Sequence, residues 1–233
     1  MNKQNKIIGL IGGMGPYASS YFYNLLLIKS SECYGAKNND DFPEILMDSL
    51  PVPDFISDTR KLSYAKKMLI ASVRKFDNCG VRSIGMICNT GHILYDDLSK
   101  ISKSKFYSMI ELTADEALKR GFRKVCVLAT PTTIKFDLYG KALSKRGIKV
   151  IYPEKRMQEL HESVIRKMVA GRKTLRDVKK MEESVKSLVK DNSLDGIILG
   201  CTELPLVFPK NNFGNVIDCM EVLADKLLER YYN

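Results

Sequence analysis

The chain has 233 residues, 45% of them hydrophobic, and carries 37 Lys and Arg against 27 Asp and Glu, a formal net charge of +10. This much apolar material excludes general disorder and suits one large domain or two small ones. No stretch approaches the roughly 18 apolar residues of a membrane span, and the first six residues lack a signal-peptide pattern. We therefore expect neither a membrane partner nor secretion.

The basic residues and the cysteines narrow the cellular setting. Basic residues are interleaved with acidic ones and match no nucleic-acid motif, so the charge indicates a solvated surface rather than a nucleic-acid partner. The six cysteines lack the regular spacing of a secreted disulfide scaffold, which predicts a cytoplasmic protein. Four of them are expected to be small core residues: Cys33, Cys79, Cys126 and Cys219.

Short β-branched runs alternate with helix-period segments along the chain. Strands are expected at 7–11, 44–47, 83–87, 124–128, 148–151, 195–199 and 215–217. Helices are expected at 17–32, 57–76, 133–145, 154–170, 174–190 and 219–230. Pro16 suits the start of the first helix and Gly80 the end of the second. The alternation predicts an α/β fold with parallel sheets and right-handed crossovers.

The two halves of the chain resemble each other. Segment 107–118 is similar to segment 216–227, and each follows a strand that ends in a cysteine and a polar residue. An internal duplication predicts two pseudo-symmetric lobes, 1–105 plus 213–233 and 106–212, with the last helix returning to the first lobe. Open parallel sheets bind ligands at the carboxyl ends of their strands, so the site is expected in the cleft between the lobes.

Cys88 and Cys201 occupy equivalent places in this duplication, each at the end of a buried strand and ahead of small polar residues that open a helix. Unpaired N–H groups at a helix start favour a thiolate. Either cysteine could therefore serve as a base. His92, four residues after Cys88, and Glu203, two after Cys201, are candidates to tune a thiol or relay a proton, with a structural histidine and a first-turn charge as the alternatives. His161 is expected on a helix surface.

Three blocks carry a specific resemblance: 7–19 (IIGLIGGMGPYAS), 87–92 (ICNTGH) and 198–206 (ILGCTELPL). Together they resemble the aspartate/glutamate racemase family, and the similarity covers nearly the whole chain in the expected order. The resemblance implies an isomerase that racemises an amino acid, most readily aspartate or glutamate, without pyridoxal phosphate, other cofactor or metal. It also implies a homodimer.

The resemblance implies roles for particular residues. Cys88 and Cys201 would flank the α-carbon, one removing the α-proton and the other delivering a proton to the opposite face. Backbone N–H groups near 13–15, 89–90 and 202–203 would hold carboxylate oxygens. The implied substrate contacts are Met14, Asn89, Thr90, Thr130 and Thr202, with Thr132 or Thr133 capping the helix after Thr130.

The chain departs from the family pattern at 53–56, where Pro-Asp-Phe-Ile stands in place of the Pro-Asp-Arg-Thr of many aspartate racemases. Phe55 cannot make a bidentate guanidinium contact. A second carboxylate would need Arg60 or a basic residue of the later helix, Arg166 or Lys167, and Arg166 is the candidate.

Other functions remain open from the sequence. The spacing of Gly13, Gly15 and Ala18 after a strand, with Glu32 downstream, is also typical of dinucleotide binding, but leaves the duplicated cysteines unexplained. Zinc binding lacks a ligand set. A binding protein without turnover, or a related enzyme acting on hydantoins, maleate or arylmalonates, would keep the same fold.

Overall fold

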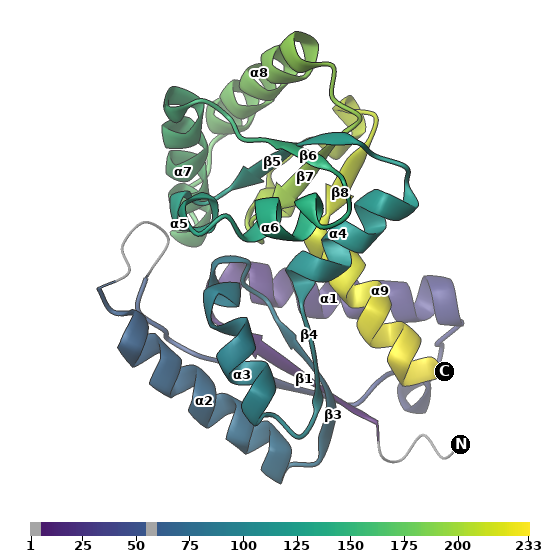
Figure 1. Ribbon diagram of the computed structural model, residues 1–233. Helices are drawn as coiled ribbons and strands as arrows, with labels where there is room; N and C mark the ends of the chain where they lie inside the picture. Colours follow the sequence, from purple (N-terminus) through teal and green to yellow (C-terminus); the bar gives the residue numbers. More distant parts are fainter. Residues whose placement is uncertain (1–5, 55–59) are drawn as a thin grey trace.

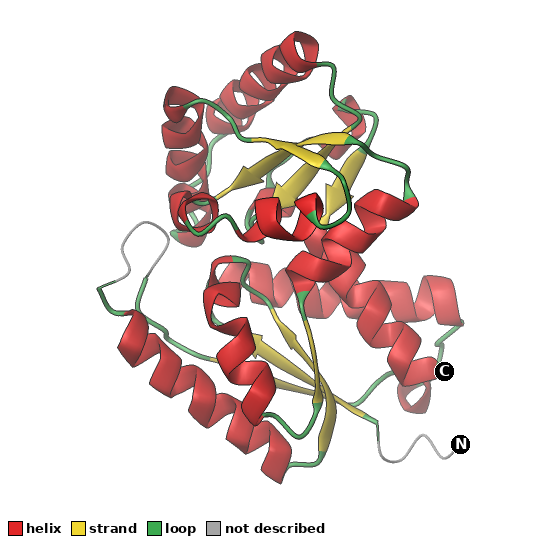
Figure 2. Cartoon of the chain, in the orientation of Figure 1, coloured by secondary structure: helices red, strands yellow, loops and turns green. Residues whose placement is uncertain are grey.

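The computed structural model describes residues 6–54 and 60–233 and contains two four-stranded parallel sheets (Figures 1 and 2). The first sheet has the strand order β2-β1-β3-β4 and the second β6-β5-β7-β8. The strands of the first are Ile7–Gly12 (β1), Ile45–Ser49 (β2), Val81–Met86 (β3) and Lys105–Tyr107 (β4). Those of the second are Lys124–Ala129 (β5), Lys149–Ile151 (β6), Gly196–Gly200 (β7) and Val216–Asp218 (β8). The predicted α/β class is confirmed.

Helices cover both faces of each sheet. The α-helices are Pro16–Tyr34 (α1), Leu62–Asn78 (α2), Tyr95–Ile101 (α3), Met109–Lys119 (α4), Pro131–Lys135 (α5), Leu138–Ser144 (α6), Lys155–Val169 (α7), Leu175–Asn192 (α8) and Cys219–Tyr232 (α9). Four short 3₁₀ helices are Asn39–Asp41 (η2), Thr90–Leu94 (η3), Leu204–Leu206 (η4) and Lys210–Asn212 (η5). None of the described helices is long and apolar enough to span a membrane.

The two sheets have equivalent strand orders, which matches the internal duplication. Two helices each pack on the sheet of the other half of the chain. Helix α4 follows β4 of the first sheet, yet Ile110, Ala114 and Ala117 pack in the core of the second. Helix α9 follows β8 of the second sheet, yet Leu223 and Leu227 pack on the first. Helix α9 thus packs on the first sheet, and α4 and α9 contact each other between the sheets (Figure 1).

Several element boundaries follow from local chemistry. Pro16 is the first residue of α1, where its missing N–H costs nothing. Gly80, at a φ of 72°, follows the end of α2 in the left-handed region that glycine adopts readily. The expected start of this helix at Ser57 lies outside the described residues. The lobe boundaries given above stay a prediction. In the structure, β4 pairs with β3 of the first sheet up to Tyr107, and β8 pairs with β7 of the second sheet.

The structure also corrects some expectations. The helix expected at 133–145 is two helices, because Asp137 takes a left-handed conformation with a φ of 50° and interrupts the backbone hydrogen bonding. His161 is buried, not exposed, because α8 packs over it, and its Nε2 lies within hydrogen-bond distance of Ser184 Oγ, at 2.9 Å. Cys33 and Cys79 are exposed rather than in the core, because each lies at the end of a helix near a surface turn.

Candidate functional site

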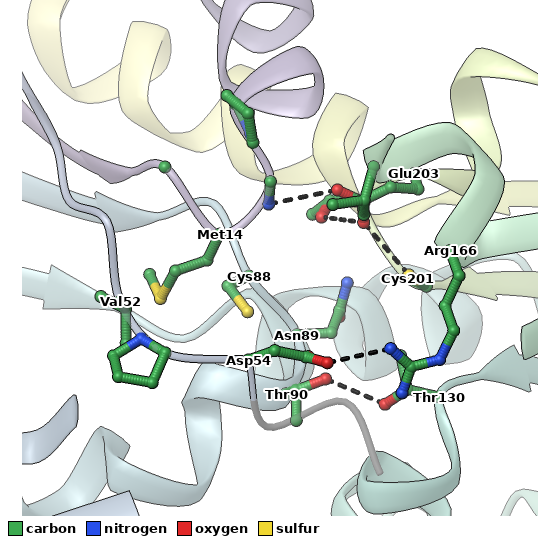
Figure 3. A pocket seen from close by; sticks show the side chains of 16 residues that line it. Met14, Val52, Asp54, Cys88, Asn89, Thr90, Thr130, Arg166, Cys201 and Glu203 are labelled. Carbon is green, nitrogen blue, oxygen red and sulfur yellow. Dashed lines mark hydrogen bonds and ion pairs between the residues drawn. The ribbon is translucent and has the colours of Figure 1, made fainter. Parts of the chain in front are cut away.

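A cavity of about 220 Å³ lies between the two lobes at the carboxyl ends of β1, β3, β5 and β7 (Figure 3). This volume is below the roughly 300–1,000 Å³ of drug-sized sites and therefore suits a small ligand. The cavity brings together every substrate-binding and catalytic residue expected from the sequence: Met14, Cys88, Asn89, Thr90, Thr130, Arg166, Cys201 and Thr202, with Glu203 beside them. His92 does not line it.

The Cys88 thiol is buried in the wall formed by the first lobe. It follows β3 and accepts the N–H of Gly91 at 3.3 Å. Burial raises the pKa of Cys88 to about 12, the Gly91 N–H opposes this rise, and the nearby Glu203 charge adds to it. Cys88 is therefore a thiol, not a thiolate, at neutral pH in this structure.

The Cys201 thiol is buried in the wall formed by the second lobe. Its Sγ donates to Oε2 of Glu203 at 3.3 Å. Burial raises the pKa of Cys201 well above its usual value, and the Glu203 charge raises it further. The expectation that helix starts favour thiolates is therefore wrong for both cysteines. A short 3₁₀ helix follows each cysteine, η3 after Cys88 and η4 after Cys201, and η3 runs directly into α3. Desolvation of the thiols outweighs the backbone N–H groups at these helix starts.

Glu203 joins the two lobes beside Cys201. Its Oε1 accepts the N–H of Gly15 at 3.2 Å, and its Oε2 also accepts the Thr202 hydroxyl at 3.1 Å. Burial raises the pKa of this carboxyl, and these hydrogen bonds oppose the rise. A Cβ at Gly15 would lie 2.6 Å from Oε1, so only glycine allows this approach.

His92 links backbone segments next to Cys88. Its Nδ1 donates to the Cys88 carbonyl at 2.8 Å and its Nε2 accepts the Met109 N–H at 3.0 Å, which fixes the neutral tautomer. Burial lowers the pKa of His92 to about 4. Both ring nitrogens are thus occupied by backbone groups, which matches the structural alternative weighed from the sequence.

Threonine hydroxyls from both lobes meet at the cavity. Oγ1 of Thr90 lies 2.9 Å from Oγ1 of Thr130 and 3.2 Å from Oγ1 of Thr133. Thr130 itself caps α5 by accepting the Thr133 N–H at 3.2 Å, so the cap is not Thr132 or Thr133. Hydroxyls can rotate to donate to a ligand oxygen, and this cluster is therefore a source of donors for a carboxylate.

The glycine-rich loop after β1 supplies fewer donors than the sequence suggested. The N–H of Gly13 is taken by Ser19 Oγ at 2.9 Å, and that of Gly15 by Glu203. The carboxylate of a ligand must therefore rely mainly on the hydroxyls and on the loops after the cysteines.

Arg166 reaches across the cavity wall from α7. Its Nη1 bonds Asp54 Oδ2 at 2.9 Å (Figure 3). Its Nε bonds Glu162 Oε1 at 2.8 Å. The bond to Asp54 holds the pKa of Arg166 above its usual value. Lys167 instead pairs with Asp177 on α8, so Arg166 is the basic residue of α7 that lines the cavity. Phe55 lies outside the described residues.

Sequence reasoning missed Asp54 and Tyr139 at this site. Asp54 lies in the segment already singled out for its departure from the family pattern, so its position was a usable signal. Tyr139 donates its hydroxyl to Asn89 Oδ1 at 2.6 Å from a fully buried position on α6. In the sequence it resembles any core tyrosine of an amphipathic helix. Among the described residues, no group of His, Cys, Asp and Glu could hold a metal ion.

Known proteins resemble the chain along nearly its whole length. The broad-specificity amino-acid racemase RacX of Bacillus subtilis is 28% identical over 228 residues, covering 97% of this chain and 98% of that protein. The aspartate racemase of Picrophilus torridus superimposes with a TM-score of 0.82 at 28% identity, covering 97% and 94% of the two chains. An aspartate racemase homologue from Pyrococcus horikoshii OT3 gives 0.81 at 29% identity, covering 98% and 100%.

A family model agrees with these likenesses. The model described as Asp/Glu/Hydantoin racemase matches residues 11–227, a range that includes both cysteine loops, the glycine-rich loop and Arg166. The chain therefore belongs to the Asp/Glu/hydantoin racemase family of cofactor-independent isomerases.

Proposed function

We propose that this protein is a cofactor-independent racemase of aspartate or glutamate, in which Cys88 and Cys201 move the α-proton. The observation that carries the proposal is the pair of buried thiols, one from each lobe, lining one small cavity. Two groups on opposite faces of a planar carbanion can invert a stereocentre without either having to move around the substrate.

The proton balance of the step is simple. One cysteine, as thiolate, takes the α-proton, and the electron pair of the broken C–H bond delocalises into the substrate carboxylate. The other cysteine, as thiol, delivers its proton to the opposite face of the α-carbon and becomes the thiolate. The two thiols thus exchange protonation states in each turnover, and the reverse reaction uses them in opposite roles.

The substrate itself helps to form the reactive thiolate. Both thiols have raised pKa values in this structure because they are buried near the Glu203 carboxylate. An amino acid brings a positively charged ammonium group into the cavity, and an adjacent positive charge favours the thiolate. Donors from Thr90, Thr130 and Asn89 would stabilise the negative charge that develops on the substrate carboxylate.

Arg166 is the proposed partner of a side-chain carboxylate, and its existing bonds bear on specificity. A guanidinium can hold a carboxylate through two parallel hydrogen bonds, but here it already bonds Asp54 and Glu162. An acidic substrate would have to replace Asp54, whereas an amino acid with a neutral side chain would leave the pair intact. This pair favours a racemase of broader specificity as the second candidate function.

The test is α-proton exchange by the purified protein. Individual L-amino acids, both acidic and neutral, are incubated in D₂O without pyridoxal phosphate, and deuterium incorporation and chirality are followed. We expect exchange and inversion in the wild type, loss of inversion in Cys88→Ala and in Cys201→Ala, and loss of both in the double variant.

Cys79→Ala is the matched control, because Cys79 is exposed at the end of α2 and does not line the cavity. We expect it to retain wild-type activity. Exchange that survives loss of both cavity thiols would contradict the mechanism. Absence of exchange with every amino acid would instead favour a binding protein or a related enzyme.

A further inference from the structure

One buried side chain touches the immediate neighbours of both cavity thiols. The Tyr139 hydroxyl donates to Asn89, the residue after Cys88. The Tyr139 ring packs on the backbone of Gly200, the residue before Cys201, so closely that a Cβ there would lie 2.8 Å from Cε2. Tyr139 therefore contacts both thiol-bearing segments, which come from different lobes.

The contacts of Asn89 fix which way its amide faces. Oδ1 accepts from Tyr139 at 2.6 Å, and Nδ2 donates to the Cys219 thiol at 3.2 Å. An amide nitrogen has two N–H donors, so one remains to serve a ligand at the cavity that Asn89 lines. Without the tyrosine hydroxyl, Oδ1 would lose its buried donor, and the amide could turn and present its oxygen to a substrate carboxylate.

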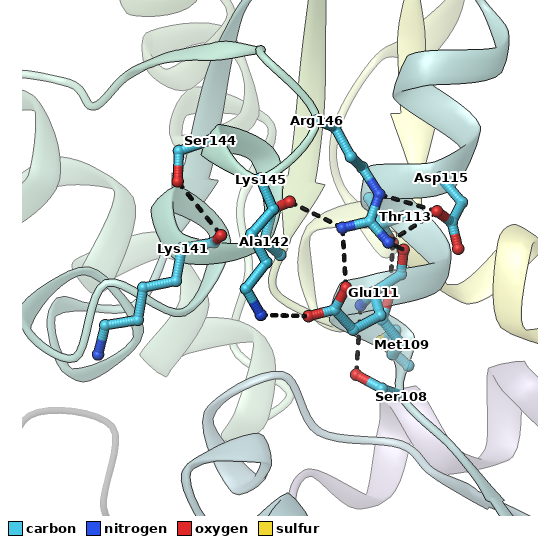
Figure 4. A network of polar contacts seen from close by, with 10 residues as sticks. All are labelled: Ser108, Met109, Glu111, Thr113, Asp115, Lys141, Ala142, Ser144, Lys145 and Arg146. Atoms are coloured by element: carbon cyan, nitrogen blue, oxygen red, sulfur yellow. Dashed lines mark hydrogen bonds and ion pairs between the residues drawn. The ribbon is translucent and has the colours of Figure 1, made fainter.

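The short helix that carries Tyr139 is anchored at its other end. Arg146, just after α6, donates to the Ala142 carbonyl at 2.7 Å and pairs with Glu111 at 2.8 Å and with Asp115 at 2.7 Å, both on α4 (Figure 4). Helix α6 has only seven residues and would be mobile without such ties. The Tyr139 ring is therefore carried by a helix that is held in place.

We propose that Tyr139 is a positioning residue of the racemase: it orients the Asn89 amide toward the substrate carboxylate and sets the spacing between the Cys88 and Cys201 segments. This inference rests on the proposed function. Tyr139 lies behind the cavity wall and does not line the cavity, so it acts through Asn89 and Gly200.

The test is a double-mutant cycle of Tyr139→Phe and Asn89→Ala, read as KM and kcat for racemisation in both directions. Removing the hydroxyl leaves a buried acceptor unsatisfied, and we expect KM to rise on the order of tenfold for both enantiomers. In the Asn89→Ala background, Tyr139→Phe should change KM by less than about twofold, because the shared interaction is already gone.

Tyr232→Phe is the matched control, because that hydroxyl donates to the Asp41 carbonyl at 2.9 Å, far from the thiols in the sequence and at the end of α9. It should leave KM unchanged. Melting temperatures of all variants show whether each one folds.

Iodoacetamide alkylation, followed by peptide mass spectrometry, gives a readout that does not need turnover. Tyr139→Phe should accelerate alkylation of Cys88, because Asn89 next to it loses its buried hydrogen bond, but not of Cys201, because the ring that packs on Gly200 is kept. Tyr232→Phe should accelerate neither. An unchanged KM, a KM effect that persists without Asn89, or an unchanged alkylation rate of Cys88 would each overturn the inference. A wild type inactive on every amino acid would instead overturn the proposed function.

Discussion

Replacing Glu203 by glutamine removes the carboxylate beside the Cys201 thiol while preserving its shape. Oε2 lies 3.3 Å from Sγ, and two unit charges at that distance repel by about 5 kcal/mol at an effective dielectric constant of 20. This figure is a ceiling, because hydrogen bonds and local relaxation absorb part of it. Even about 1.4 kcal/mol corresponds to tenfold more thiolate. We therefore expect the substitution to lower the pKa of Cys201.

The assay is the rate of iodoacetamide alkylation at pH 8, resolved by peptide mass spectrometry, because the thiolate is the reactive species. Cys201 in Glu203→Gln should react at least about tenfold faster than in the wild type. Glu183→Gln, an exposed glutamate on α8, is the matched control and should leave the rate unchanged. An equal or slower rate in Glu203→Gln would refute the view that this carboxylate suppresses the thiolate.

Three further predictions concern packing, pH and specificity. Gly200→Ala places a methyl group against the Tyr139 ring, and overpacking should lower the free energy of unfolding by about 1–3 kcal/mol in urea denaturation; an unchanged value would contradict this packing. His161 is neutral in the folded protein because its pKa is lowered to about 4. Its contribution to the free energy of unfolding is therefore complete above about pH 6.5 and is lost as the pH falls toward 4. Between pH 7 and pH 5 the free energy of unfolding should fall by about 2 kcal/mol less in His161→Gln than in the wild type. An identical pH dependence in the two proteins would show that His161 does not contribute. Asp54→Asn should lower KM for glutamate but not for methionine, because it frees one side of Arg166, and equal effects on both substrates would argue against binding of the side-chain carboxylate by Arg166.

The sequence predicted the sheet architecture well where strands lie in apolar runs. Strand β4 was missed because it follows a polar, lysine-containing stretch that gives no alternation pattern, whereas β6 and β8, which are equally short, were predicted. The break at Asp137 was missed because a left-handed non-glycine residue carries no Gly or Pro signal. The burial of His161 was missed although the residue shares one face of α7 with the apolar residues Val164, Ile165 and Met168, which pack under α8.

The candidate site was predictable in its residues but not in its electrostatics. Cys88, Cys201 and Glu203 could be placed at one cleft because the duplication puts both cysteines at strand ends. The direction of the thiol pKa shifts could not be predicted, because burial and the distance to Glu203 are tertiary properties. Likewise, the bond between Arg166 and Asp54 joins residues 112 positions apart, a contact that sequence spacing does not reveal.

The fate of the α-proton in the first turnovers shows whether two thiols act on opposite faces of the α-carbon. An L-amino acid on which the wild type is active is incubated in D₂O, and the product and the remaining substrate are separated by chirality before equilibrium. We expect the D-product to carry deuterium at the α-carbon while the remaining L-substrate keeps its proton. Product that retains the original proton, or L-substrate that exchanges before inversion, would contradict the two-thiol mechanism.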